Sequence, residues 1–369
     1  MPPRITPLVA GLPATVPFVG PETQERQRGT RFRARIGANE NGFGPSPKAV
    51  AAMAEAAGEV WKYCDPENWD LKQALARHLG VGPDNVVVGE GIDGLLGLTV
   101  RLVVEPDLPV VTSLGAYPTF NFHVAGFGGR LVTVPFTGDR EDPQALAATA
   151  RAEDARLVYF SNPNNPMASW WPAGTVVGLM DAVPDDTILC IDEAYGEFAP
   201  DGTLPPIDVS RPNVLRFRTF SKAYGMAGAR IAYAVGAASL IREFDKIRNH
   251  FGVNRIAQAG ALAALGDPAH LAWIRERIVE ARARIGRIAE ANGLKPLPSA
   301  TNFVTVDCGH DGAFARRLLV ALAQRGVFVR MPGVAPQDRC IRIGCGPAAD
   351  LDVLEAELPA ALAVARREA

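Results

Sequence analysis

Short apolar runs alternate with longer helical segments through the middle of this chain, and this alternation constrains the fold more than any other feature. Strand-like runs at 85–88, 109–112 and 130–134 are separated by helical patterns at about 92–104 and 117–126. The same rhythm continues as far as residue 235. Strands that alternate with helices of about ten residues or more predict an α/β domain with a mostly parallel sheet.

The segments on either side of this region have different patterns. The N-terminal residues are irregular and rich in proline and arginine, and helical patterns at 47–57 and 68–80 precede the first strand. Residues 238–292 are almost entirely helical in period, and the stretch 268–291 is long enough to link two lobes. Three strand-like runs and two helices then predict a compact α+β unit, at 302–307, 311–325, 327–330, 341–343 and the C-terminus. We therefore expect three parts: an N-terminal arm at 1–37 that packs with the small domain, a large domain at 38–255, and an interdomain helix with the small domain at 256–369.

The composition is that of a soluble globular protein. Of the 369 residues, 48% are hydrophobic and 21% are charged, with a net charge of −2. This charge gives no reason to expect a nucleic acid or an anionic membrane as a partner, and no apolar run approaches the roughly 20 residues that span a bilayer. Five cysteines without a CxxC motif indicate reduced thiols in the cytoplasm, and five scattered histidines give no metal-ligand spacing, so we expect no metal.

Lys222 stands where an apolar run meets a turn of small residues and glycines. It follows the run 213–220 and precedes a segment that ends at Arg230. A lysine that is partly desolvated beside another cation has a lowered pKa and becomes an amine nucleophile towards aldehydes. The alternative interpretation is a strand-end lysine whose ammonium group simply reaches water.

Two further strand ends carry polar side chains that complement such a lysine. The run 187–191 ends at Asp192, with Tyr195 just beyond it, and the run 156–160 leads into a polar turn that contains Asn165. In an open parallel sheet the carboxyl ends of the strands meet at one crevice. Pyridoxal phosphate needs an aldehyde-binding lysine, a carboxylate at its ring nitrogen and hydrogen bonds to its phenolate oxygen. Lys222, Asp192, and Asn165 with Tyr195 match these needs.

The segment 89–94 fits the pattern GxGxxG between a strand and a helix. This pattern supports an alternative function, that of an NAD-dependent oxidoreductase. Two helices precede the strand, however, and no strand ending in an acid follows about twenty residues later, as a dinucleotide-binding fold would require. A helix N-terminus also holds other phosphates, so we interpret Gly91, Ile92 and Asp93 as the cup for the phosphate of a cofactor.

In these motifs the sequence resembles the fold-type I pyridoxal-phosphate aminotransferases of class I/II, most closely the histidinol-phosphate aminotransferase branch. The matching motifs are Ala38–Asn41, Tyr63–Pro66, Asn164–Pro166, Asp192–Tyr195, Ser221–Lys222, Arg230 and Cys340–Gly344. The resemblance implies a large domain with a mostly parallel sheet and a smaller α+β C-terminal domain. The chain departs from the family pattern at Met167–Ala168, Ile92–Gly94 and Ala232.

The resemblance also implies roles for further residues. The cofactor would contact Tyr117 through its ring and Thr219, Ser221 and Arg230 through its phosphate, with Tyr63 reaching the phosphate from the neighbouring subunit of a homodimer. The substrate side would be formed by Asn39, Asn302, Arg330 and Arg342. Lys222, Asp192 and Tyr195 would be the catalytic residues.

The activity implied by the resemblance is transfer of an amino group between an amino donor and 2-oxoglutarate. Arg330 and Arg342, with the arm residues Arg31, Arg33 and Arg35, favour histidinol phosphate as the donor. Met167–Ala168, the pair Trp170–Trp171 and Phe18 favour an aromatic amino acid instead. A decarboxylase or lyase of the same fold, similar to threonine-phosphate decarboxylase, remains open as an alternative reaction.

Overall fold

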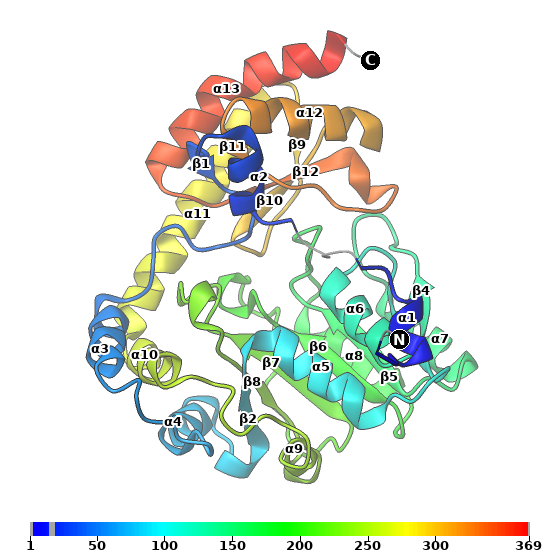
Figure 1. The fold of residues 1–369 in the computed structure, drawn as a ribbon. Coiled ribbons are helices and arrows are strands. Elements are labelled where there is room, and N and C mark those ends of the chain that lie inside the picture. The colour runs from blue at the N-terminus through cyan, green and yellow to red at the C-terminus, as the bar shows by residue number, and fades with distance from the viewer. Residues whose placement is uncertain (1–2, 15–18, 368–369) are drawn as a thin grey trace.

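A seven-stranded sheet organises the larger lobe of the computed structural model, which describes residues 3–14 and 19–367 (Figure 1). Its strands are β2 (Val86–Gly89), β3 (Pro109–Ser113), β4 (Arg130–Val134), β5 (Leu157–Ser161), β6 (Ile188–Asp192), β7 (Val214–Thr219) and β8 (Ala232–Val235), in the order β2-β8-β7-β6-β5-β3-β4. Strand β8 runs antiparallel to both of its neighbours, and all other neighbouring pairs are parallel. The prediction of a mostly parallel sheet is confirmed.

The apolar strands form this sheet because both of its faces are covered. All residues of β3, β5 and β6 are buried, as expected for central parallel strands. Successive side chains point to opposite faces, so Val158 and Phe160 pack with α7 (Pro143–Ala152) and α8 (Ala173–Ala182). Leu157 and Tyr159 belong to the core on the other face, where α5 (Gly91–Val103), α6 (Pro118–Gly126) and α9 (Ala238–Phe244) also contribute.

The smaller lobe is built around an antiparallel sheet with the order β12-β10-β9. Its strands are β9 (Lys295–Pro296), β10 (Phe303–Asp307) and β12 (Cys340–Gly344), covered by α12 (Gly312–Gln324) and α13 (Ala348–Arg367). The long helix α11 (Pro268–Ala291) runs from the larger lobe into the smaller one (Figure 1). This is the place predicted for an interdomain helix, while the exact division at residues 37 and 255 stays a prediction.

The N-terminal segment divides between the two lobes. Strand β1 (Ala34–Arg35) pairs in parallel with β11 (Val327–Phe328) of the smaller lobe, and α2 (Pro21–Arg28) lies beside them (Figure 1). Helix α1 (Pro7–Gly11) instead lies near α6 and β4, where Leu8 comes close to Gly128. Among the described residues of the predicted arm, α2 and β1 therefore lie with the smaller lobe, whereas α1 lies with the larger one.

The remaining helices lie at the outer side of the larger lobe, beyond the edge strand β2 (Figure 1). Helix α10 (Arg255–Leu265) packs against α3 (Pro47–Ala57) and α4 (Trp69–Leu79). Short 3₁₀ turns are η1 (Pro83–Asn85), η2 (Gly196–Phe198), η3 (Ala227–Ala229) and η4 (Gln337–Arg339). None of the helices formed by residues 3–14 and 19–367 is long and apolar enough to cross a membrane.

Candidate active site

A cavity of about 290 Å³ opens at the carboxyl ends of the central strands. The last residues of β5, β6 and β7, which are Ser161, Asp192 and Thr219, all line it. Most of the predicted site residues line it as well: Asn39, Ile92, Asp93, Tyr117, Asn165, Asp192, Tyr195, Thr219, Ser221, Lys222, Arg230, Arg330 and Arg342. Gly91, Asn302 and Tyr63 are the predicted residues that do not. The convergence of strand ends therefore collects these residues at one place, as expected for a parallel sheet.

Lys222 lies half-buried in this cavity with few partners. Its Nζ donates a hydrogen bond to the main-chain oxygen of Asn39 at 3.2 Å and lies 5.8 Å from the centre of the Tyr195 ring. Burial, reinforced by the positive charge of Arg230, lowers the pKa of Lys222 to about 8. An amine with this pKa is partly deprotonated near neutral pH, which is the state that a nucleophile requires.

Asp192 is a buried carboxylate held by two uncharged donors. Its Oδ2 accepts a hydrogen bond from the hydroxyl of Tyr159 at 2.7 Å, and its Oδ1 accepts one from the main-chain N–H of Ala194 at 2.9 Å. Burial raises the pKa of Asp192 to about 6, although both hydrogen bonds oppose this shift. A buried carboxylate that forms no salt bridge within the described residues is suited to a positively charged ligand nitrogen.

Tyr159 is a site residue that the sequence reasoning missed. It is almost fully buried, lines the cavity beside Asp192 and stacks on Phe120 with 4.6 Å between the ring centres. The one available signal was a hydroxyl-bearing side chain inside an otherwise apolar strand, two residues before the strand ends.

Arg342 and Asn165 contact each other across the two lobes. A guanidinium nitrogen of Arg342, on β12, donates to Oδ1 of Asn165, in the turn after β5. Burial lowers the pKa of Arg342 to about 10, and its Nε has no hydrogen-bond partner among the described residues. An arginine that is buried with donors to spare is suited to an anionic ligand.

Asn39 contacts three of the predicted site residues. Its Nδ2 donates to the hydroxyl oxygen of Tyr195 at 2.9 Å, while its main-chain oxygen accepts from Lys222 and, at 3.1 Å, from Nδ2 of Asn302. Burial raises the pKa of Tyr195 to about 12, so that its hydroxyl keeps its proton at neutral pH. Asn302 lies behind Asn39, outside the cavity lining, and therefore supports Asn39.

Arg330 and Arg342 lie side by side on the small-lobe wall. Their main chains form a short antiparallel bridge, with the N–H of Arg342 donating to Arg330 O at 2.6 Å. Both side chains line the cavity, and Arg330 also donates to the main-chain oxygen of Val19 at 2.9 Å. Two guanidinium groups at one wall favour binding of a phosphate or a carboxylate.

Glycine at position 91 permits a close approach of Arg230 to the N-terminus of α5. Gly91 has φ +78°, and an added Cβ would come within 2.3 Å of Nη2 of Arg230. Arg230 also reaches the hydroxyl of Ser221 at 3.5 Å, and that hydroxyl accepts from Oγ1 of Thr219 at 2.9 Å. A helix N-terminus, a guanidinium group and two hydroxyls form a site that favours a phosphate.

The GxGxxG segment does not belong to a dinucleotide-binding fold. Strand β2, which precedes it, is at the edge of the sheet and pairs only with the antiparallel strand β8. In the dinucleotide-binding fold the corresponding strand is central and parallel to its neighbours. The oxidoreductase alternative is therefore wrong.

Tyr117 and Asp93 lie next to each other in the cavity lining. Tyr117 caps the start of α6, and its hydroxyl donates to Oδ1 of Asp93 at 2.7 Å. Burial raises the pKa of Tyr117, so it stays protonated and continues to donate. The contact places an aromatic ring beside the phosphate-binding segment.

Tyr63 lies at the surface instead of the cavity. It is 78% exposed and packs against Phe251 with 4.8 Å between the ring centres. Trp61 and Trp69, close to it in sequence, are also exposed. Within the described residues, this places a group of aromatic side chains on the outside of the larger lobe.

Among the described residues, those predicted for an aromatic pocket do not line the cavity. None of Met167, Ala168, Trp170 and Trp171 lines the cavity, because the turn packs inward and Trp171 donates its ring N–H to the main-chain oxygen of Glu141 at 2.8 Å. Phe18 lies outside the described residues. The arm arginines also lie elsewhere: Arg33 pairs with Glu357, Arg35 pairs with Glu22 and Glu40, and Arg31 is exposed.

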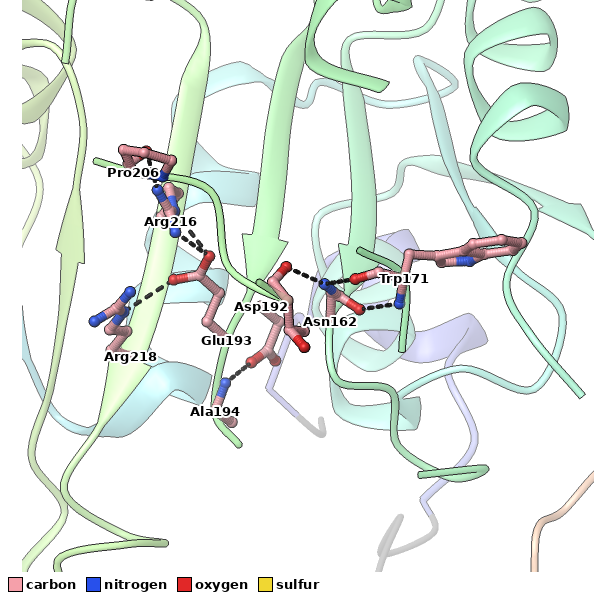
Figure 2. A network of polar contacts seen from close by, with 9 residues as sticks. Asn162, Trp171, Asp192, Glu193, Ala194, Pro206, Arg216 and Arg218 are labelled. Carbon is pink, nitrogen blue, oxygen red and sulfur yellow. Dashed lines mark hydrogen bonds and ion pairs between the residues drawn. The ribbon is translucent and has the colours of Figure 1, made fainter. Parts of the chain in front are cut away.

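A second buried carboxylate, that of Glu193, follows Asp192 directly. It is not part of the cavity lining and points towards Arg216 and Arg218 (Figure 2). Glu193 is fully buried and accepts from Nε of Arg216 at 2.8 Å and from Nε of Arg218 at 2.9 Å. Both arginines come from the neighbouring strand β7, on the face opposite Phe217 and Thr219. This cluster joins β6 to β7 immediately behind the cavity.

The residues present fit pyridoxal phosphate. Lys222 provides an amine with a lowered pKa, Asp192 provides a carboxylate for a ring nitrogen, and the Gly91–Arg230 approach leaves donors for a phosphate. Four basic side chains against two acidic ones give the cavity a positive balance that favours anionic ligands: Lys222, Arg230, Arg330 and Arg342 against Asp93 and Asp192.

Comparison with known families gives one match over most of the chain. Residues 35–358 match the model for aminotransferase class I and II. A histidinol-phosphate aminotransferase from Anaeromyxobacter sp. is 36% identical over 332 residues, which cover 89% of this chain and 90% of the relative. One from Moorella thermoacetica is 34% identical over 346 residues, 93% of this chain and 87% of the relative.

Solved structures show the same similarity. The crystal structure of histidinol-phosphate aminotransferase from Sinorhizobium meliloti in complex with pyridoxal-5'-phosphate is 58% identical, has a TM-score of 0.95, and covers 99% of this chain and 98% of that one. Aspartate aminotransferase from Thermus thermophilus with maleate has a TM-score of 0.82 at 19% identity, covering 98% and 100% of the two chains. The latter similarity shows the fold alone.

Proposed function

The chain belongs to the aminotransferase class I and II family, and on that premise we propose that it is a histidinol-phosphate aminotransferase dependent on pyridoxal phosphate. It moves the amino group of histidinol phosphate to 2-oxoglutarate. The observation that carries this function is one cavity lined by Lys222, Asp192 and the arginine pair Arg330–Arg342. The Sinorhizobium meliloti protein, which bears this name and holds the cofactor, supports it at 58% identity.

The chemistry follows from the charge states of the cavity residues. Pyridoxal phosphate, when bound, supplies an aldehyde that reacts with amines and a ring that accepts electrons from the bond broken in the substrate. Lys222 binds the aldehyde through Nζ and, once released, moves a proton at the same atom, which its pKa of about 8 permits near neutral pH. Asp192 would hold a proton on the ring nitrogen, because its buried carboxylate takes part in no salt bridge among the described residues.

Further residues of the cavity orient the cofactor and hold its charges. Asn165 and Tyr195 donate towards the phenolate oxygen, and the proton on Tyr195 is secured by a pKa of about 12. The hydroxyls of Thr219 and Ser221, with Arg230 and the first turn of α5, bind the phosphate. Tyr117 packs against the ring while Asp93 fixes its hydroxyl.

The arginine pair on the small-lobe wall of the cavity indicates which amino donor the enzyme uses. Histidinol phosphate carries a phosphate and no carboxylate, so Arg330 and Arg342 would both serve its phosphate. 2-Oxoglutarate and glutamate carry two carboxylates, which the same pair would bind in the second half of the reaction. The absence of aromatic residues 170 and 171 from the cavity lining removes the main support for an aromatic donor.

A panel of amino donors with 2-oxoglutarate tests this proposal. Histidinol phosphate is expected to give the highest kcat/KM, and Arg330→Ala to lower it about tenfold to a hundredfold, since charged hydrogen bonds contribute roughly 1.5–3 kcal/mol each. Arg33→Ala, an arginine whose ion pair lies outside the cavity, is the matched control. Better turnover of phenylalanine or tyrosine, or release of carbon dioxide in single turnovers, would contradict the proposed reaction.

The active site is proposed to be shared between two subunits of a homodimer in the cytoplasm. The exposed group around Tyr63 supports the dimer, and five free cysteines support a reducing compartment. Mixing Lys222→Ala with Tyr63→Phe, each impaired alone, should restore activity, because one site of the mixed dimer then has both native residues. A monomer in sedimentation experiments, or no recovery after subunit exchange, would contradict the shared site.

A further inference from the structure

Glu141 is a buried carboxylate with no part in the proposed reaction. It is 1% exposed, lies between β4 and α7, and takes part in no salt bridge among the described residues. Its Oε1 accepts from the main-chain N–H of Ser161 at 3.1 Å, from the hydroxyl of Ser161 at 2.6 Å and from Nδ2 of Asn164 at 2.6 Å. Its Oε2 accepts from the hydroxyl of Ser113 at 2.8 Å. Four uncharged donors thus surround one carboxylate and compensate for its burial.

The segment that carries Glu141 is itself well anchored. Thr137 and Arg140 exchange main-chain hydrogen bonds, and the hydroxyl of Thr137 donates to Asp142 at 2.8 Å. Asp142 in turn caps the first turn of α7. These hydrogen bonds hold the main chain on both sides of Glu141, so the position of its carboxylate is set by its own segment as well as by its donors.

Three of the four donors of Glu141 belong to Ser161 and Asn164, in the turn that forms one wall of the cavity, and the fourth is Ser113 at the end of β3. Ser161 lines the cavity, and Asn164 is followed directly by Asn165, whose side chain meets Arg342. The side chain of Asn164 also accepts from the N–H of Met167 at 2.9 Å, so it braces both ends of the turn. On the outer side Asn162 and Trp171 exchange hydrogen bonds (Figure 2), and the ring N–H of Trp171 returns to the main chain of Glu141.

We propose that Glu141 is a positioning residue of the aminotransferase site, which fixes the turn 161–166 so that the amide of Asn165 faces the cofactor and Arg342. The inference rests on the proposed function for its chemistry, but its contacts are independent of which amine is the donor. Glu141 acts through Ser161 and Asn164 and touches neither cofactor nor substrate. A misplaced amide would weaken the cofactor's phenolate contact and free Arg342 from its partner.

Binding of pyridoxal phosphate to the apo-enzyme tests the inference without any turnover. Glu141→Leu should weaken this binding on the order of tenfold to a hundredfold, as expected for a displaced contact group, and should shift the pH midpoint of the bound cofactor's visible absorption band. Glu141→Gln keeps an acceptor oxygen for Ser161 and Asn164, and Ser113 can reverse its hydroxyl, so this variant should remain close to wild type. Glu153→Leu, an exposed carboxylate at the other end of α7, is the control.

A double-mutant cycle separates positioning from general stability. If Glu141 acts through Asn165, Glu141→Leu should add little to the loss already caused by Asn165→Ala. Additive losses, or a lower melting temperature with unchanged cofactor binding and absorption, would overturn the inference. If Glu141→Leu does not fold, Ser113→Ala replaces it, because it removes one hydrogen-bond donor of Glu141 that lies outside the cavity. It should weaken cofactor binding in the same way, but less. A different amino donor would contradict the proposed function and leave these binding results unaffected.

Discussion

Asp192 and Glu193 are neighbours in sequence and are both buried, yet the protein treats their carboxylates in opposite ways. Asp192 faces the cavity, accepts from the uncharged donors Tyr159 and Ala194, and has its pKa raised by burial to about 6. Glu193 faces the other side of the sheet and is neutralised by Arg216 and Arg218 (Figure 2). One carboxylate is left for a ligand, and the other holds two strands together.

The difference follows from strand geometry. Residues that follow one another along a strand point to opposite faces, so one position can support chemistry while the next supports the scaffold. On the cavity side burial lowers the pKa values of Lys222 and Arg342, whereas on the ion-paired side, against the effect of burial, Glu193 raises the pKa of Arg218 and joins β6 to β7. Substitutions on the first side should therefore change activity, and those on the second should change stability.

The largest expected effect is that of Lys222→Ala. Turnover should fall on the order of ten-thousandfold, because the nucleophile and the proton carrier are lost together. The apo-protein should not be destabilised at neutral pH, since the charged lysine is disfavoured in the folded state. Between about pH 8 and pH 10.5, Lys222 is protonated in the unfolded wild-type chain but not in the folded one, so the free energy of unfolding should rise with pH. Urea titrations measure this rise, and the variant should lack it. If Lys222→Ala lowered the free energy of unfolding and kept the turnover, the contrast between a chemical side and a structural side of the sheet would be wrong.

Glu193→Gln should have the next largest effect, and on stability. It leaves Arg216, whose side chain is 3% exposed, and Arg218 without their carboxylate, which should cost about 3–5 kcal/mol of unfolding free energy. Turnover per folded molecule should change little, because the cluster lies behind the cavity. Glu280→Gln, which loses only an exposed pair with Arg277, should cost less than about 1 kcal/mol. Equal losses in the two variants would show that the cluster is not a structural clamp.

Asp192→Asn should act mainly on chemistry, with a decrease in turnover of roughly a hundredfold to a thousandfold as the ring nitrogen loses its charged partner. In the apo-protein the carboxylate binds its proton more tightly when folded, so it lowers wild-type stability as pH rises from about 3.8 to 6. The variant should lose that pH dependence. Denaturation curves across this range measure it, and an unchanged slope would mean that Asp192 is not the titrating group.

Tyr159→Phe should give the smallest effect. The stack on Phe120 is kept, while Asp192 loses the donor at Oδ2 and its pKa should rise further. The loss of one hydrogen bond to a carboxylate should cost about 1.5 kcal/mol. An upward shift in the acid limb of the turnover profile would measure the change, and no shift would assign the charge state of Asp192 to burial alone.

Most of the fold was accessible from the sequence because its signals are local. The strand–helix alternation predicted the parallel sheet, and helix α11 begins and ends where its helical period does. Strand ends marked by Asp192, Asn165 and Lys222 predicted a common cavity, because parallel strands deliver their carboxyl ends to one edge. The strand that runs the other way, β8, has no local signature.

What the sequence could not predict depends on side chains meeting across long separations. Glu141 stands in a charged loop sequence that favours exposure, and only the fold brings it to Ser113 and Asn164. The sequence shows that the Trp170–Trp171 pair is apolar but not towards which part of the fold it points. In the folded chain the pair does not line the cavity. Burial and partner choice, rather than secondary structure, limited the prediction of the site.

The reversed strand β8 also sets the order in which the phosphate site can be completed during synthesis on the ribosome. Strand β2 leaves the ribosome early, but its one partner in the sheet is β8, so Val86 has to wait for Val235 before it can pair. Gly91 follows β2 and Arg230 precedes β8, so these two residues come together only when the two strands pair. We therefore expect a nascent chain that stops before β8 to contain Lys222 without an assembled phosphate site, and to bind the cofactor only after the whole large sheet has been translated.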